Sequence, residues 1–274
     1  MHIFTMAKYS KGSPIDDIAY LARSEHRAPT LVALTVRSRS RSELWEMTGV
    51  SSSTIRRTLS EFEDRNWVRR NEYQYEVTPL GAYIASAVAE LIERVEIERK
   101  VRDIWPWLPD EESGFTIEMC ADAIVTVAEA DNPYAPVNRF LTLIEDTDRI
   151  RFVGTDIAIF EPYRDELCQR VIDGMQTEII DPPSVVTYYR STYPDLFAET
   201  LASGNLTMWL HDDLPPYGIA IFDNRVAICG HDSDSATVRV LLDTDSEKAR
   251  EWAESKFDFY RRQTPTIPLE TVEN

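Results

Sequence analysis

The sequence predicts an α+β fold in two parts, and three observations lead to this prediction. Residues 41–81 have the pattern of two short helices, a glycine turn and a basic hairpin. Residues 80–102 place their apolar side chains on a single helical stripe. Beyond residue 115, short apolar runs alternate with helical patterns. We therefore expect an N-terminal helical domain, a long connecting helix and a C-terminal mixed-sheet α/β domain.

The motif between Arg41 and Gly81 predicts its own local structure. Its inward-facing apolar residues are Leu44, Val50, Ile55, Leu59 and Phe62. Gly49 suits a tight or left-handed turn between the two helices, and the serines that follow it supply an N-cap. After Trp67 the period changes to two, so Val68–Arg70 and Tyr73–Val77 predict a hairpin around Asn71-Glu72. Two helices followed by a basic β-ribbon form a winged helix-turn-helix, whose second helix lies in a DNA major groove.

The polar side chains of this motif are suited to DNA. The second helix turns arginines and small hydroxyls outward, opposite its apolar face. Arginine pairs with phosphate or binds guanine through two hydrogen bonds, and small hydroxyls allow close approach to base edges. The candidate DNA-binding residues are Arg41, Ser51, Ser52, Ser53, Arg56, Arg57, Ser60, Arg69, Arg70 and Tyr73. The alternative is that the winged helix serves protein interaction or dimerisation.

The net charge of −18 is unevenly distributed. Residues 1–105 hold 16 basic and 15 acidic side chains, whereas residues 106–274 hold 13 and 32. From Arg27 to Tyr75 nine arginines accompany six acidic residues, so the positive charge is local to the motif. Only five of the 29 basic residues are lysines, a composition that resembles halophilic archaeal proteins more than an ordinary acidic protein. In molar salt the Debye length is roughly 3 Å, so we expect base contacts and two-fold avidity to outweigh phosphate contacts.

The chain has an expected division into domains. Residues 1–12 are expected to be disordered, and 13–104 to form the DNA-binding domain, which includes a long helix over 80–102. Two further helices, Ile15 to about His26 and Ala28–Val36, precede the motif. The stripe on the long helix comprises Leu80, Ile84, Val88, Leu91 and Val95. We expect it to pair with a second copy in a homodimer; the alternative is packing on its own domain.

The second half predicts a sheet flanked by helices. Residues 105–114, rich in Trp and Pro, are expected to be a linker, 115–263 an effector or sensor domain, and 264–274 a flexible tail. The expected strands are Ala123–Ala128, Ile157–Phe160, Glu178–Ile180, Leu206–Leu210, Tyr217–Phe222, Val226–Cys229 and Thr237–Leu242. The expected helices are Ala135–Glu145, Glu161–Gly174, one or two over Pro183–Ser203, and Ser246–Arg262.

Several segments carry a family resemblance. They are WLHDDLPPYGIAIFDNRVAICGHD, VLLDTDSEKAREWAESKFDFYRR, NPYAPVNRF at Asn132–Phe140 and DGMQTEIIDPP at Asp173–Pro183. Together with the winged-helix motif they resemble archaeal, especially haloarchaeal, winged-helix regulators with a methanogenesis-regulatory type of effector domain. The resemblance runs from about Ile15 to Arg262. It implies a DNA-binding transcription regulator with a sensory α/β domain whose ligand is generally unknown.

The strand pair near the C-terminus also resembles the phospholipase D type of fold, in a degenerate form. The active enzymes need HxKxxxxD followed by a glycine, with His as nucleophile and Lys as phosphate ligand. Aligning Asp223 with the aspartate puts Gly230 at the glycine, but Pro216 and Gly218 then occupy the histidine and lysine positions. Covalent phosphoryl transfer therefore lacks both its nucleophile and its phosphate ligand, and we expect no enzyme activity.

A small-molecule pocket is a further expectation. Aromatic residues gather near the last strands, and the candidate pocket residues are Tyr188, Trp209, Tyr217 and Asp223. Core packing is the alternative for each aromatic residue. Neither a metal site nor a cofactor is expected, because His211-Asp212-Asp213 reads as a solvated loop.

The cysteines and the absence of targeting signals suggest a cytoplasmic protein. Cys120, Cys168 and Cys229 are widely spaced and odd in number, so they are expected to be reduced, and redox sensing by one of them stays open. No signal peptide or membrane span is expected. The leading hypothesis is a homodimer that binds promoter DNA and a possible small-molecule effector. The alternatives are a DNA-associated scaffold without a ligand or, least favoured, an enzyme.

Overall fold

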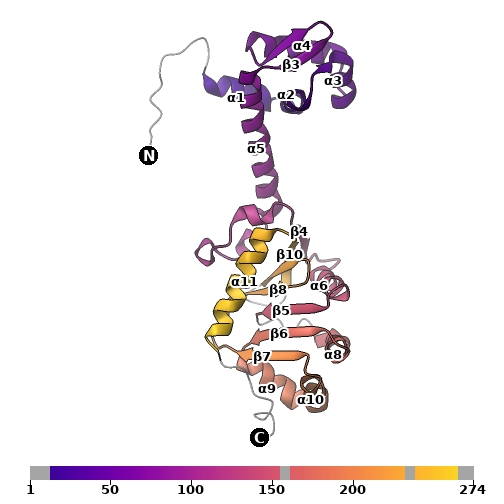
Figure 1. The fold of residues 1–274 in the computed structure, drawn as a ribbon, viewed down its shortest axis with the longest axis vertical. Helices are drawn as coiled ribbons and strands as arrows, with labels where there is room; N and C mark the ends of the chain where they lie inside the picture. The colour runs from indigo at the N-terminus through magenta and orange to yellow at the C-terminus, as the bar shows by residue number, and fades with distance from the viewer. Residues whose placement is uncertain (1–12, 155–160, 232–237, 265–274) are drawn as a thin grey trace. The chain divides into compact units, whose positions relative to one another are not determined.

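The computed structural model describes residues 13–154, 161–231 and 238–264 (Figure 1). The chain divides into two compact units, one up to Glu96 and one from Ile97. The expected disordered N-terminus, most of the expected tail, and the strand expected at Ile157–Phe160 lie outside the described residues. A mixed α+β architecture is confirmed.

The N-terminal unit is a small helical core with a three-stranded sheet. Its elements are α1 (Pro14–Ala22), α2 (Arg27–Val36), β1 (Arg39–Ser40), α3 (Arg41–Thr48), α4 (Ser52–Asp64), β2 (Val68–Asn71), β3 (Gln74–Val77) and the first part of α5 (Pro79–Val101). The strand order is β1-β3-β2, and both pairings are antiparallel. The predicted inward residues Leu44, Ile55, Leu59 and Phe62 are fully buried in one cluster, with Val50 packed against it.

Capping residues set the helix ends as the sequence indicates. Ser51 accepts a hydrogen bond from Thr54 N at the start of α4, and Ser40 forms a capping box with Glu43 at the start of α3. Gly49 ends α3 at φ +69°, the left-handed conformation that glycine adopts without strain. The hairpin turn lies at Glu72-Tyr73, one residue later than expected, because Asn71 pairs with Gln74 as the last rung of the ladder.

The base of the hairpin meets the start of α5 at Gly81. A Cβ at this position would lie 1.9 Å from the carbonyl oxygen of Trp67, which is backbone and has nowhere to move. Thr78 reinforces the junction, because its hydroxyl donates to the carbonyl of Asn66 at 2.6 Å and accepts from Gly81 N. The hairpin and α5 are therefore joined by close backbone packing.

The C-terminal unit is built on a seven-stranded mixed sheet. Its strands are β4 (Ile124–Val127), β5 (Arg149–Val153), β6 (Gln176–Asp181), β7 (Leu206–Leu210), β8 (Tyr217–Ile221), β9 (Val226–His231) and β10 (Val238–Thr244). Their order is β4-β10-β9-β8-β5-β6-β7; β5, β6 and β7 pair in parallel, and the other pairings are antiparallel. Strand β5 was not expected from the sequence, because the charged Arg149 and Arg151 interrupt its apolar run.

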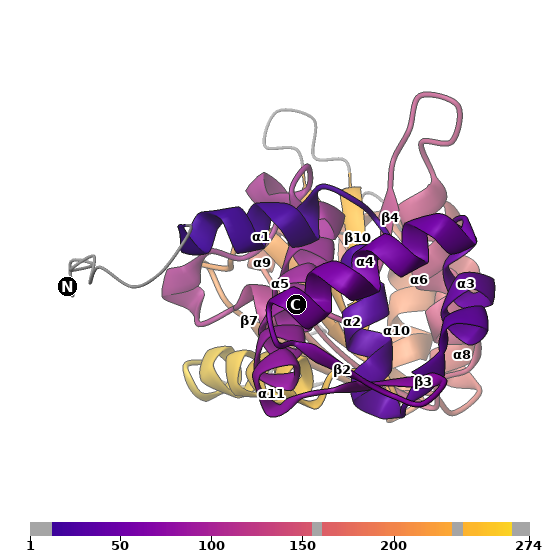
Figure 2. The same ribbon diagram turned by 90° about the horizontal axis from the view of Figure 1, so that it is seen from above.

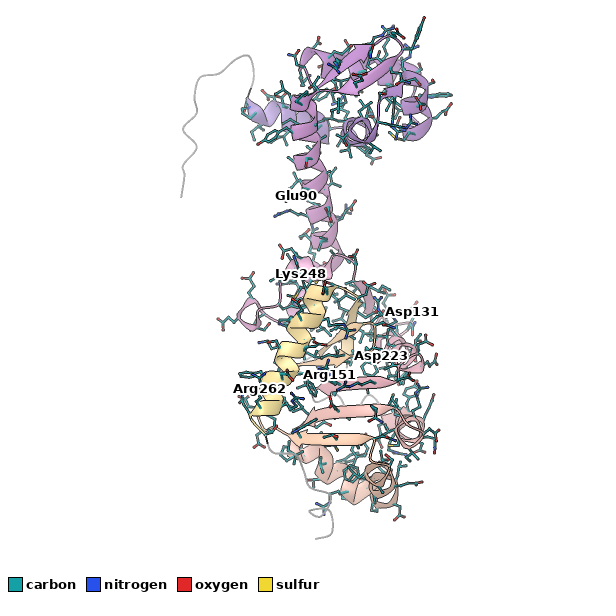
Figure 3. All side chains as sticks on the ribbon, in the orientation of Figure 1. Glu90, Asp131, Arg151, Asp223, Lys248 and Arg262 are labelled. Atoms are coloured by element: carbon teal, nitrogen blue, oxygen red, sulfur yellow. The ribbon has the colours of Figure 1, made fainter. Side chains whose placement is uncertain are left out.

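Helices cover the two faces of this sheet unequally (Figures 1 and 2). One face packs against α11 (Glu247–Arg262). The opposite face carries α6 (Ala135–Glu145), α8 (Arg164–Ile172), α9 (Pro183–Thr192) and α10 (Pro194–Ala202). Ion pairs add to the apolar contacts: Arg151 of β5, labelled in Figure 3, reaches Glu254 of α11 at 2.7 Å. Arg139 of α6 and Arg225 together bind the fully buried Asp243 of β10.

The segment 105–114 differs from the expected linker. It forms short 3₁₀ turns that pack onto the C-terminal unit, with Leu108 buried and the Trp252 indole donating to the carbonyl of Ser113 at 3.0 Å. Gly230 lets Trp107 approach, since a Cβ there would lie 2.4 Å from the Trp107 carbonyl oxygen. The boundary between the units falls inside α5 instead, between Glu96 and Ile97. The two tryptophans that suggested a break pack against the core of this unit, and Pro109 is buried.

Candidate functional site

Helix α4 presents one polar face to solvent. Its buried residues are Ile55, Thr58, Leu59 and Phe62, and its exposed residues include Ser52, Ser53, Arg56, Arg57 and Ser60. The two sets separate as the helical period requires, because residues three and four apart share a face. The outward residues expected to meet DNA therefore lie together on one surface of α4.

The arginines of this unit fall into two groups. Arg27 and Arg65 lie over the ring of Tyr20 at 4.1 and 4.2 Å, and Arg65 also pairs with Asp17 at 2.9 Å and Glu61 at 2.7 Å. These two arginines hold α1 and α2 against α4. Other arginines are bound locally: Arg37 pairs with Glu43, and the Arg39 side chain donates to the carbonyl of Ala33.

The second group consists of three exposed arginines within residues 41–81 that have no partner in the described part of their own unit. Arg41, Arg56 and Arg57 form no hydrogen bond or ion pair with any part of the chain that the structure describes. Because their charges are not compensated inside the unit, they are available to an external anion. Net charge alone does not separate these arginines from the structural ones; the contacts do.

The hairpin of β2 and β3, here called the wing, carries two arginines that already make contacts within it. Arg69 pairs with Glu76 at 2.8 Å across the hairpin, and Asn71 also donates to Glu76. The hydrogen bonds from Asn71 and Arg69 lower the pKa of Glu76. Arg70 donates to the carbonyl of Glu72 at 2.9 Å, and Tyr73 at the tip is 82% exposed. A DNA phosphate would have to compete with Glu76 for Arg69.

The serines have different local roles. Ser51 caps α4 and also contacts the hydroxyl of Ser53 at 2.9 Å. The buried Thr58 contacts His26 at 3.0 Å and ties α4 to the start of α2. Burial and the nearby charges of Arg27 and Arg57 lower the pKa of His26. Sequence reasoning missed this polar contact, because no local pattern links residues so far apart in the chain.

The apolar stripe on α5 is divided by the structure. Ile84 and Val88 pack against the core of the N-terminal unit. Leu80, Leu91 and Val95 stay 62%, 54% and 45% exposed. The middle of the stripe packs on its own unit, as the alternative expected. Pairing of the exposed residues with a second copy stays a prediction.

The four residues that the sequence predicted to line a ligand pocket do not lie together in the structure. Trp209 and Tyr217 are buried in the core beneath α11, whereas Tyr188 lies on α9, 40% exposed, over the opposite helical layer. Asp223 sits in the turn between β8 and β9 and accepts a hydrogen bond from Asp148 N at 2.7 Å. The four residues do not surround a common space, because Trp209 and Tyr217 point to one face of the sheet and Tyr188 lies above the other.

The described residues offer little other site chemistry. They contain no group of three His, Cys, Asp or Glu side chains able to hold a metal ion. In that part of the chain no helix is both long and apolar enough to cross a membrane. The cysteines are free thiols, and burial raises the pKa of Cys120 to about 12 and also that of Cys168. High thiol pKa values oppose the thiolate that redox sensing requires.

Comparisons with known families agree with this two-part organisation. Residues 133–263 match the family model of the middle domain of the methanogenesis regulatory protein FilR1. Residues 15–100 match the model of the HVO_A0261 N-terminal domain. The chain resembles an archaeal transcription regulator. No curated protein matches it.

Solved structures offer only distant likenesses. The archaeal chromatin protein TrmBL2 is 14% identical with a TM-score of 0.41, covering 91% of this chain and 97% of that one. The phosphatidylserine synthase of Haemophilus influenzae Rd KW20 is 14% identical with a TM-score of 0.40, covering 56% of this chain and 41% of that one. An IclR transcriptional regulator from Alicyclobacillus acidocaldarius is 13% identical with a TM-score of 0.22, covering 91% and 97% of the two chains. Scores this low carry no argument about function.

Proposed function

We propose that this chain is a homodimeric transcription regulator that binds promoter DNA through α4 and the wing. The observation that carries the proposal is the pair Arg56 and Arg57, exposed on α4 beside small hydroxyls and without a partner in the described chain. The match to a regulatory protein family over residues 133–263 supports it. A protein with this role acts in the cytoplasm, where the DNA is.

Contacts to DNA would divide by position. Arg56, Arg57, Ser53 and Ser60 would meet base edges, because they share the exposed face of α4. Arg41, Arg70 and Tyr73, together with Ser51 and Ser52 at the helix start, would meet the sugar-phosphate backbone and set the position of the helix. The acidic C-terminal unit would sense a small molecule. No catalytic role is proposed, since Pro216 and Gly218 stand where a phosphodiesterase would need its nucleophile and its phosphate ligand.

The direct test removes the two free arginines of α4. Genomic sites recovered with the wild-type chain supply the specific DNA, and fluorescence anisotropy measures affinity. Arg56→Ala with Arg57→Ala should abolish specific binding while leaving the melting temperature unchanged, because both side chains lie outside the core. Each lost bidentate base contact corresponds to about 1–3 kcal/mol.

A matched control removes the same charge elsewhere. Arg23→Ala with Arg99→Ala takes two exposed arginines from outside the proposed surface, one at the end of α1 and one in α5. This variant should keep nearly full specific affinity. If the α4 variant bound the recovered sites as tightly as the control does, the role assigned to α4 would be rejected.

A further inference from the structure

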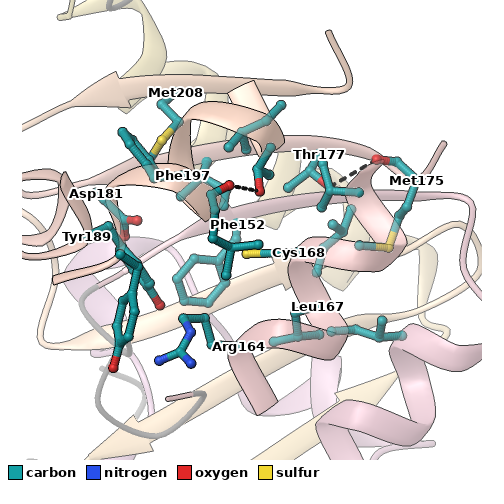
Figure 4. Close-up of a pocket in the computed structure, with 18 of the residues that line it drawn as sticks. Phe152, Arg164, Leu167, Cys168, Met175, Thr177, Asp181, Tyr189, Phe197 and Met208 are labelled. Carbon is teal, nitrogen blue, oxygen red and sulfur yellow. Dashed lines mark hydrogen bonds between the residues drawn. The ribbon is translucent and has the colours of Figure 1, made fainter. Parts of the chain in front are cut away.

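The C-terminal unit contains a partly open cavity unrelated to the pocket that the sequence suggested. It lies between strands β5–β7 and helices α8–α10, has a volume of about 170 Å³, and is lined mainly by apolar side chains (Figure 4). They include Phe152, Leu167, Val171, Phe197 and Met208. A dry apolar cavity of roughly 150 Å³ is large enough to hold benzene. The space therefore suits a ligand of about one aromatic ring.

One carboxylate faces this apolar space without a partner. Asp181 is the last residue of β6 and is 4% exposed. Its Oδ1 is buried and makes no hydrogen bond to any described part of the chain. Burial raises its pKa to about 8. An unpaired buried acid destabilises a fold, so its presence here calls for an external partner.

The arginine at that end of the cavity is already engaged. In Figure 4, Asp181 and Tyr189 lie toward one end, and Leu167 and Met175 toward the other. Arg164 pairs with Glu161 and with Asp165, each at 2.8 Å, and its guanidinium lies 3.5 Å from the ring centre of Tyr193. Because these two acids already compensate Arg164, its charge does not neutralise Asp181.

Hydroxyl groups do not satisfy Asp181 either. Tyr193 and Tyr188 both donate to Oε1 of Glu161, and Thr200 donates to the carbonyl of Leu196 at 2.7 Å. The titratable and charged groups around this end are Glu161, Arg164, Asp165, Cys168, Tyr188, Tyr189 and Tyr193. Among the described residues around Asp181, none supplies a buried hydrogen-bond donor with positive charge.

We propose that the cavity binds a small, mainly apolar amine whose ammonium group donates to Oδ1 of Asp181. Binding of the amine is independent of the proposed function, and only its role as the effector of a transcription regulator rests on that function. The apolar walls would take the hydrocarbon part of the ligand, and the single carboxylate would select a cation over an alcohol or an acid. Since Asp181 is protonated in the empty cavity at neutral pH, an ammonium ion that binds its ionised form displaces a proton to solvent.

The test uses matched amines and alcohols on the full chain. Propylamine, benzylamine and phenethylamine are compared with propanol, benzyl alcohol and phenethyl alcohol by thermal shift and calorimetry at pH 7. The best amine should bind roughly tenfold or more tightly than its alcohol, the scale of one charge-assisted hydrogen bond. Calorimetry in buffers of different ionisation enthalpy should report release of up to one proton. No preference for the amine in any pair, or no binding in any pair, would overturn the proposal.

Two variants separate the carboxylate from the cavity. Asp181→Asn keeps the shape and should abolish both the preference for the amine and the proton release. The exposed-loop control Asp212→Asn should behave as wild type. Cys168→Met, which fills the space from α8, should weaken all ligands alike. Retained preference for the amine in Asp181→Asn would place the binding site elsewhere.

The two proposals fail separately. The variant Arg56→Ala with Arg57→Ala, which should lose DNA, should still bind the amine. Amine binding without any specific DNA binding by the wild-type chain would reject the regulatory role alone. Specific DNA binding without amine preference would reject the ligand alone.

Discussion

Two aspartates are buried in the same seven-stranded sheet, and their surroundings are opposite. Asp243 on β10 is fully buried and accepts hydrogen bonds from Arg139 at 2.8 Å and from Arg225 at 2.6 Å. Asp181 on β6 is nearly as buried but has one oxygen without any partner in the described chain. The first charge is balanced within the fold and holds α6 to the sheet. The second has no such partner within the described chain, and this is the observation on which the proposed amine site rests.

The arginines of the N-terminal unit also differ in whether they have partners inside the unit. Arg65 is held by Asp17, Glu61 and the ring of Tyr20, and it joins helices. Arg56 and Arg57, nine and eight residues earlier in the chain, have no such partners in the described residues. In both units, the charges that the chain itself compensates hold elements together, and the groups proposed to bind DNA or a ligand are ones that it leaves without a partner in the described residues.

Removing the balanced aspartate should have the largest effect on stability. Asp243→Ala leaves Arg139 and Arg225 without their shared acceptor. Breaking a buried ion pair typically costs about 3–5 kcal/mol. We expect about 3 kcal/mol, because both arginine side chains keep about a quarter of their surface in water. Urea unfolding of the C-terminal unit measures the loss, and Asp212→Ala, in an exposed loop, should change little. A loss below about 1 kcal/mol would mean that the Asp243 ion pairs stabilise the fold no more than a surface ion pair does.

Apolar residues on α5 allow the same comparison. Leu91 and Val95 are exposed, whereas Ile84 and Val88 pack against their own unit. Leu91→Asp with Val95→Asp should therefore give folded monomers with roughly 100-fold weaker DNA binding, since avidity between half-sites is lost. Light scattering gives the mass. Ser86→Asp, on the opposite side of the helix, is the control. A dimer that persisted in the double variant would move the interface away from this stripe.

The unbalanced aspartate should make stability depend on pH. Asp181 has a pKa of about 8 in the fold, against about 3.9 in an unfolded chain. Between these values the folded state holds more protons, so stability falls as pH rises, by up to about 1.4 kcal/mol per pH unit. Asp181→Asn removes this slope. The melting temperature of the variant relative to wild type should increase from pH 5 to pH 8 and level off above; a constant difference would mean that Asp181 is ionised throughout.

The wing should show the smallest effect. Arg69 is paired with Glu76, so Arg69→Ala should weaken binding to all DNA sequences modestly and lower the salt dependence by about one ion at most. Glu76→Gln should act in the opposite direction, because it frees Arg69 for phosphate. Anisotropy titrations at several salt concentrations measure both. Tighter binding by Arg69→Ala than by wild type would exclude the wing from the interface.

Local signals in the sequence predicted much of this molecule. The cap at Ser51, the left-handed Gly49 and the buried face of α4 all depend on residues within one or two turns of each other. For the same reason the exposed arginines of α4 could be named in advance. These features need no knowledge of distant contacts.

The cavity could not be predicted in this way. Its position depends on the alternation of Thr177, Ile179 and Asp181 toward one face of β6, which sequence periodicity shows, and on helices covering that face, which it does not. Trp209 and Tyr217 were assigned to a pocket because they are aromatic, yet the register of their strands turns them toward α11. Ion-pair partners such as Arg139 and Asp243 are 104 residues apart in the chain, so no local sequence pattern links them.

The contact between Gly81 and the Trp67 carbonyl has a consequence for sequence variation. With a Cβ only 1.9 Å from backbone atoms, no other amino acid fits unless the hairpin separates from α5. A library randomised at positions 81 and 82 and selected for folded protein should recover glycine alone at 81 and many residues at 82. Among chains that share this junction, position 81 should therefore be nearly invariant even where the DNA-facing residues have diverged, and it would record the architecture of the wing rather than the DNA sequence it binds.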